Sequence, residues 1–68
     1  MAISARNHLK GEITDIKLGD VVAQVTISVE SGTVESVITR QSVEEMNLRK
    51  GDSVSAVVKA TEVMISKQ

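Results

Sequence analysis

Hydrogen-bond donors gather in two short segments of this 68-residue chain. The first, Ser4-Ala5-Arg6-Asn7, offers a hydroxyl, a guanidinium and an amide. The second, Lys59-Ala60-Thr61-Glu62, offers an ammonium group and another hydroxyl. The alanine in each segment is small enough for a ligand to approach the neighbouring backbone N–H groups. Donors combined with one or two cations are what an oxyanion site requires, because the oxygens of the anion accept hydrogen bonds.

Each segment also has an ordinary structural interpretation. Residues 4–7 could be a solvated N-terminal tail, and residues 59–62 could be a hairpin turn. Composition favours these interpretations when either segment is taken alone. Only the two segments together indicate an anion site.

Motifs and residue types typical of enzymes are absent. The sequence has no nucleophile elbow, phosphate-binding glycine loop or metalloprotease motif. There is no cysteine and His8 is the single histidine, which excludes thiolate nucleophiles and metal cages built from several cysteines or histidines. Glu44 and Glu45 are better explained by the start of a helix than by acid–base catalysis. We therefore expect a binding protein and not an enzyme.

Charge and composition also limit the partners. The chain contains no Phe, Tyr or Trp and has a net charge of −1. Single strands of nucleic acid stack on aromatic rings, and phosphate backbones are attracted to basic surfaces, so we expect no nucleic-acid partner. Charged residues interrupt the N-terminal region, and no apolar run has the length of a membrane span. We expect a cytoplasmic protein without a membrane partner.

The length of the chain makes self-association the expected source of stability. A small domain of this kind buries only about 60% of the surface of its unfolded chain and usually depends on disulfides, a metal or a partner subunit. Without cysteine there are no disulfides, and a core without aromatic rings buries little area per residue. We therefore expect a homo-oligomer.

Alternation of apolar and polar residues with a period of two predicts β-strands. It is clearest in the second strand, with Val21, Ala23, Val25, Ile27 and Val29 on one face. Ser31-Gly32 would turn the chain into a third strand over residues 34–39. In the first strand the apolar register shifts between Ile13 and Ile16, which predicts a β-bulge.

The connections and the remaining elements complete the predicted architecture. Residues 18–20 would close the first hairpin, with Gly19 in the left-handed conformation. Ser42 and Glu45 match a capping box and predict a short helix that begins at Ser42. Residues 54–58 would form a fourth strand, and Val63 and Ile65 would mark a fifth. The sequence thus predicts a mainly β protein, a five-stranded OB-like barrel with one short helix between strands 3 and 4.

Four apolar residues fall on the outward side of these strands: Val22, Val37, Val57 and Met64. Single exposed apolar residues are normal on protein surfaces. Four in so short a chain favour a buried interface between subunits.

The sequence closely resembles the molbindins, the small Mop-type proteins that bind molybdate or tungstate. The matching residues are 4–11 (SARNHLKG), 19–25 (GDVVAQV), 42–45 (SVEE) and 59–65 (KATEVMI). The resemblance covers essentially residues 1–68 as a single Mop domain. The same domain recurs in molybdate-responsive regulators and in the ATPase subunits of molybdate transporters.

The resemblance implies both an assembly and a role. It implies an OB-like barrel assembled into a hexamer, a trimer of dimers, with molybdate or tungstate held between subunits for intracellular storage and homeostasis. The anion would be bound through its oxygens, without direct protein ligands to the metal and without an organic cofactor. The alternative is an oligomeric regulatory or interaction module that has no ligand of its own.

The expected site residues come from the two donor-rich segments and the first hairpin. We expect side-chain donors from Ser4 and Arg6, backbone donors around Lys59, and a contribution from a neighbouring chain. The full set is Ser4, Ala5, Arg6, Asn7, Asp20, Val21, Lys59, Ala60 and Thr61. Two positions depart from the family pattern, because Ala60 lacks the hydroxyl that is common there and Asp20 would repel an anion unless it points away.

Overall fold

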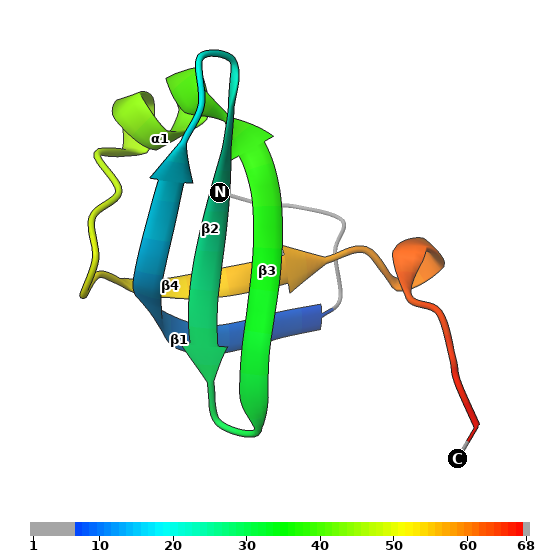
Figure 1. Ribbon diagram of the computed structural model, residues 1–68. Helices are drawn as coiled ribbons and strands as arrows, with labels where there is room; N and C mark the ends of the chain where they lie inside the picture. Colours follow the sequence, from blue (N-terminus) through cyan, green and yellow to red (C-terminus); the bar gives the residue numbers. More distant parts are fainter. Residues whose placement is uncertain (1–6, 68) are drawn as a thin grey trace.

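The protein is a single antiparallel sheet with one short helix. The computed structural model describes residues 7–67 (Figure 1). The elements in chain order are β1 (Asn7–Leu18), β2 (Val22–Val29), β3 (Gly32–Thr39), α1 (Arg40–Met46), β4 (Ser53–Val58) and the 3₁₀ turn η1 (Ala60–Glu62). The strands are ordered β3-β2-β1-β4 in the sheet. The predicted mainly β class, with a helix between the third and fourth strands, is confirmed.

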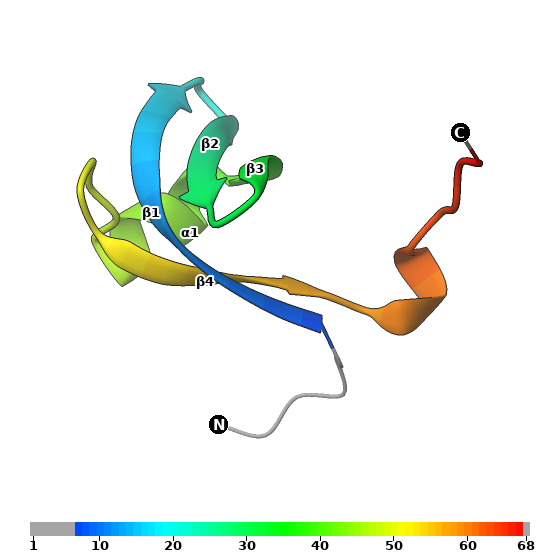
Figure 2. The same cartoon turned by 90° about the horizontal axis from the view of Figure 1, so that it is seen from below.

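β1 connects two parts of the sheet, because its first half pairs with β4 and its second half pairs with β2. Residues 7–12 pair with β4, and residues 11–18 pair with β2. The register with β2 shifts between Ile13 and Asp15, so the predicted bulge is confirmed. β1 bends along its length, and β4 runs with its first half across the direction of β2 and β3 (Figures 1 and 2).

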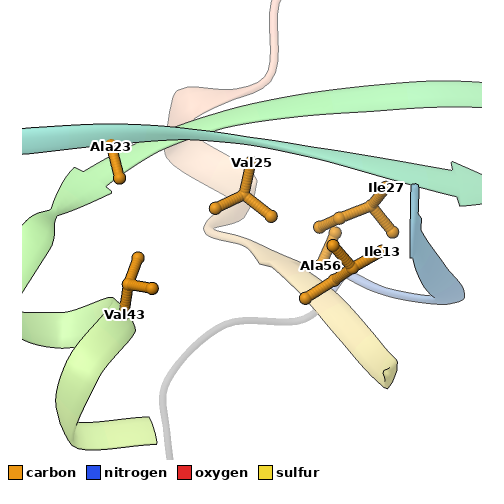
Figure 3. Packing of buried hydrophobic residues seen from close by; sticks show 6 residues of the cluster. All are labelled: Ile13, Ala23, Val25, Ile27, Val43 and Ala56. Atoms are coloured by element: carbon orange, nitrogen blue, oxygen red, sulfur yellow. The ribbon is translucent and has the colours of Figure 1, made fainter. Parts of the chain in front are cut away.

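The core is small and aliphatic. It consists of Ile13, Ala23, Val25, Ile27, Val43 and Ala56. Ile13, Ile27 and Ala56 point toward one another, and α1 places Val43 opposite Ala23 (Figure 3). Several large apolar side chains of the described residues stay exposed, among them Val21 (73%), Met64 (93%) and Ile65 (94%). One chain alone therefore leaves much apolar surface uncovered.

The prediction of a five-stranded closed barrel is wrong for the single chain. Only four strands form among the described residues, and the sheet is open because β3 and β4 do not pair. Val63 and Ile65, expected in a fifth strand, lie in irregular backbone after η1. A strand needs the backbone of a neighbour for its hydrogen bonds, and the chain runs away from the sheet after η1 (Figures 1 and 2).

The helix begins earlier than predicted. The N-cap is Thr39 and not Ser42, because the Thr39 hydroxyl accepts a hydrogen bond from the Ser42 N–H at 3.0 Å. The first turn of α1 contains no acidic residue, so Glu44 and Glu45 are not at the helix start either. The reason is that Thr39 ends β3 with extended backbone and can cap the helix directly.

Gly19 does not have the left-handed conformation that the sequence suggested. Among the described residues, the glycines with positive φ are Gly32 and Gly51. Gly19 is instead a point of close approach: its N–H donates to the Val22 carbonyl at 2.8 Å, and a Cβ here would lie 2.9 Å from that oxygen. A glycine is therefore needed for space and not for its φ.

The four apolar residues predicted to face outward are all exposed. Val22, Val37 and Val57 lie on strands of the sheet, and Met64 lies after η1. Within residues 7–67 no helix has the length and apolar character needed to span a bilayer. An interface role for these side chains remains a prediction.

Replacing Gly11 with alanine should destabilise the fold by about 1–3 kcal/mol, the usual cost of overpacking. A Cβ at this position would overlap the Ser28 carbonyl oxygen and lie 2.9 Å from Ile27 Cγ2. Denaturant unfolding measures the change, and Lys10→Ala on the outward side of the same strand is the control. Equal stability of the two variants would contradict the close approach of β1 and β2 at Gly11.

Replacing Thr39 with alanine should cost about 1 kcal/mol, because an N–H at the start of α1 loses its acceptor. Ser42→Ala should cost less, and Thr33→Ala, an exposed threonine of β3, serves as the matched control. Urea unfolding curves compare the three variants. A larger loss of stability for Ser42→Ala than for Thr39→Ala would show that Ser42 and not Thr39 is the N-cap.

Candidate functional site

The fold brings Asn7, the last residue of the first donor-rich segment, to the residue that precedes the second segment. Asn7 begins β1 and lies opposite Val58 at the end of β4, 51 residues away in the chain. The Asn7 side-chain amide donates to the Val58 carbonyl at 3.3 Å. Lys59, Ala60 and Thr61 follow directly, and we call them together with Asn7 the β1–β4 end. Antiparallel pairing places the start of one strand beside the end of the other, which is why Asn7 and the residues that follow β4 lie at the same end of the sheet.

Three of the expected site residues are not placed by the structure. Ser4, Ala5 and Arg6 lie outside the described residues 7–67. Arg6 directly precedes Asn7 in the sequence. Their part in the site stays a prediction.

The backbone of the β1–β4 end offers donors. In η1 the N–H groups of Glu62 and Val63 donate to the carbonyls of Lys59 and Ala60, at 2.9 and 3.4 Å. The first amides of a 3₁₀ turn, here those of Ala60 and Thr61, have no partner within the turn itself. All four residues from Lys59 to Glu62 are exposed. The segment can therefore present two N–H groups, an ammonium and a hydroxyl to an anion.

Asp20 and Val21 lie at the other end of β1. They line a depression together with Thr39, Arg40, Gln41 and Glu44. The β1–β2 connection that contains them is at the top of Figure 1, whereas β4 leads into η1 at the right. Within one chain the structure therefore does not bring Asp20 and Val21 to the β1–β4 end.

Arg40 holds this second region together. Its N–H donates to the Val21 carbonyl at 2.8 Å, and its guanidinium donates to the Gly19 carbonyl at 3.3 Å. The guanidinium also forms an ion pair with Glu44 at 3.6 Å. Two carboxylates, those of Asp20 and Glu44, thus share the depression with one arginine. This charge balance makes the depression by itself a weaker anion site than the β1–β4 end.

Sequence reasoning did not select Thr39 or Arg40 as site residues. The structure places both beside Asp20, with the Thr39 hydroxyl donating to the Ser42 hydroxyl at 2.8 Å. Their one signal in the sequence was their position just before the predicted helix. Residues 7–67 contain no group of three or more His, Asp or Glu side chains arranged to hold a metal cation.

Comparison with known families identifies the chain. Residues 3–65 match the TOBE domain family. The chain belongs to the TOBE-domain family. Among its Mop-type members, molybdenum-pterin-binding protein 2 of Clostridium pasteurianum is 46% identical over 66 residues, which cover 96% of this chain and 97% of that protein.

Solved structures of similar proteins have the same fold. A molybdate binding protein from Sporomusa ovata superposes with a TM-score of 0.94 at 37% identity, covering 98% of this chain and all of that chain. The cytoplasmic molybdate-binding protein ModG, with molybdate bound, gives a TM-score of 0.82 at 41% identity. That match covers 88% of this chain but 43% of the ModG chain.

Proposed function

We propose that this TOBE-domain protein binds molybdate or tungstate at subunit interfaces of a homo-oligomer and stores the anion inside the cell. The observation that carries the proposal is the pairing of Asn7 with Val58, which places Asn7 at the end of the sheet where Lys59, Ala60 and Thr61 follow β4. The Sporomusa and ModG relatives, which are named as molybdate-binding, support the choice of ligand. The chain acts by binding and not as an enzyme.

The chemistry of the β1–β4 end suits a tetrahedral dianion. Molybdate carries no proton near neutral pH, so donors can satisfy all of its oxygens. Phosphate at the same pH carries a P–OH group, whose proton would face a donor and remain unpaired. An unsatisfied buried polar group costs about 1–3 kcal/mol, which corresponds to roughly ten- to a hundredfold discrimination. Sulfate must be rejected by the size of the pocket alone.

We place the proposed anion site at a subunit interface because one chain by itself does not enclose an anion. Lys59, Ala60 and Thr61 are exposed in the single chain, so they cannot enclose an anion without other groups. Asp20 and Val21, at the far end of β1, would reach the anion from a neighbouring chain. The proposed assembly is a hexamer built as a trimer of dimers, in the cytoplasm, without a nucleic-acid or membrane partner.

The proposed ligand is the free anion, held through its oxygens without protein ligands to the metal. The Clostridium relative is named for a molybdenum-pterin. A pterin is a flat ring system that stacks well on aromatic side chains, and this chain has no Phe, Tyr or Trp. We therefore propose that no organic cofactor is bound.

The second candidate function is an oligomeric interaction module without a ligand. The small core and the large exposed surface favour self-association whether or not an anion is bound. The two candidates differ in their response to oxyanions.

Molybdate should raise the melting temperature of the protein. A ligand at a hundred times its Kd adds about 2.7 kcal/mol to the native state, a shift on the order of 10 °C for a chain of this size. Differential scanning calorimetry with molybdate, tungstate, sulfate and phosphate measures the effect. We expect shifts with the first two that exceed those with sulfate and phosphate. The absence of a shift with every anion would favour the module without a ligand.

Arg6→Ala and Lys59→Ala should each weaken molybdate binding by roughly ten- to a hundredfold, because a hydrogen bond to a charged group contributes about 1.5–3 kcal/mol. Isothermal titration calorimetry gives the affinities. Arg49→Ala and Lys50→Ala remove the same charges from the exposed turn before β4 and should bind as the parent does. Equal weakening in the control variants would mean that only overall charge matters and would remove Arg6 and Lys59 from the site.

A further inference from the structure

The turn between β1 and β2 is held at two points by one residue of α1. Arg40, the first residue of the helix, donates its backbone N–H to the Val21 carbonyl at 2.8 Å and its guanidinium to the Gly19 carbonyl at 3.3 Å. The Gly19 N–H in turn donates to the Val22 carbonyl at 2.8 Å. The carbonyls of Gly19, Val21 and Val22 are therefore all occupied by donors of the same chain. The turn lies beside α1 at the top of Figure 1.

Two backbone N–H groups of this turn have no backbone acceptor. Within residues 7–67, neither the Asp20 N–H nor the Val21 N–H donates to a backbone carbonyl. Both residues are exposed. A backbone N–H group that is taken out of water needs another acceptor. The turn can therefore offer backbone donors to an anion, as the β1–β4 end does.

The hydrogen bond from the Arg40 guanidinium sets the direction of one of these donors. The Gly19 carbonyl and the Asp20 N–H belong to the same peptide unit, and in a trans peptide they point in opposite directions. Because the guanidinium binds the carbonyl, the Asp20 N–H points away from Arg40. Rotation of this peptide unit would break the hydrogen bond, so Arg40 opposes any change in the direction of the donor.

We propose that Arg40 is a positioning residue for the anion site: it aims the Asp20 N–H at an anion that the β1–β4 end of a neighbouring chain holds. This inference rests on the proposed function and identifies the group through which the turn acts. The anion meets the backbone of Asp20 and not its carboxylate, which can extend into water because the residue is exposed. An acidic residue can then stand beside an anion site although its side chain carries charge of the same sign.

Attraction by the charge of Arg40 is the weaker explanation for a part in binding. The guanidinium forms an ion pair with Glu44 at 3.6 Å, and Asp20 lines the same depression. Two carboxylates beside one guanidinium leave this region without an excess of positive charge to attract a dianion. Arg40 can therefore contribute more by orienting the turn than by its charge.

Two variants separate positioning from charge. Arg40→Ala removes the guanidinium but keeps the backbone N–H that binds Val21. Arg40→Lys keeps the charge but replaces the planar fork, which serves Gly19 and Glu44 together, with a point-like ammonium. Isothermal titration calorimetry should show molybdate affinity reduced by about tenfold in both variants, the loss expected for one hydrogen bond to a charged group. Arg49→Ala removes the same charge from an exposed turn and, as the matched control, should keep the affinity of the parent.

The salt dependence of the same titrations gives a second check. The Debye length falls from about 10 Å at 0.1 M salt to about 3 Å at 1 M, so high salt screens attraction between separated charges. A loss of positioning should leave the ratio of parent to Arg40→Ala affinity unchanged at high salt. A ratio that falls to one at high salt, or an Arg40→Lys variant that binds as tightly as the parent, would show that Arg40 acts by its charge and would overturn the proposal.

A role of Arg40 in stability alone predicts different results. A less stable fold would lose affinity for molybdate and sulfate equally, whereas a turn that no longer fixes its donor should discriminate less by size. We therefore expect the ratio of molybdate to sulfate affinity to fall in Arg40→Ala. Saturating molybdate should also slow hydrogen exchange of the Asp20 N–H, measured by NMR, in the parent and not in the variant. An unchanged affinity ratio, or equal protection of Asp20 in both proteins, would contradict positioning.

The inference and the proposed function can be told apart when one of them fails. If molybdate binds the parent and both Arg40 variants equally well, the anion function stands and the role of Arg40 fails. If no oxyanion binds the parent, the anion function fails and the role of Arg40 fails with it. If Arg40→Ala does not fold, Arg40→Lys provides the same affinity ratio and the same exchange measurement.

Discussion

The double pairing of β1 is the constraint on which the rest of the structure depends. β1 pairs with β4 along its first half and with β2 along its second half, and both pairings include Gly11. The bulge after Ile13 lets the strand bend between the two partners. Only glycine fits at the crossing, since a Cβ would overlap the Ser28 carbonyl. This bend carries β4 across the other strands and leaves β3 and β4 as separate edges.

A core made without aromatic rings leaves a single chain with little buried apolar surface. Six small or aliphatic residues form the buried cluster, and two of them are alanines. Apolar surface remains between β3 and β4, on the outward side of the strands, and on Val63, Met64 and Ile65 after η1. Burying such surface against a second copy would provide the stability that disulfides or a large core provide in other small domains. Self-association and function would then be linked, because the residues of the proposed anion site are exposed in one chain and need other groups to enclose an anion.

The proposed anion site at the β1–β4 end can be formed largely by backbone donors. An anion without a proton needs donors on all sides, and η1 provides backbone N–H groups directly after Lys59 in the chain. Backbone donors are held by the fold and do not lose side-chain freedom on binding, which suits discrimination by size and proton count. The second region, with Asp20, Arg40 and Glu44, has the wrong balance of charge to do this alone. Its place at the opposite end of β1 makes it a candidate for contact with a neighbouring chain.

The sequence by itself determined four strands, the bulge, the outward apolar residues and the pair of donor-rich segments. These are local patterns of alternation and side-chain chemistry, which a strand or a turn carries wherever it is placed. Sequence reasoning placed the helix N-cap at Ser42 and a left-handed conformation at Gly19, and both were wrong. Neighbouring hydroxyl residues, and different glycines, cannot be told apart by residue type alone. Only the tertiary structure decided that Thr39 caps the helix, that Asn7 pairs with Val58 just before Lys59, and that Asp20 lies at the other end of β1. The tertiary structure also decided that the described residues form four strands and not five. Strand pairing depends on which backbone edges lie within reach, and that is a property of the folded chain.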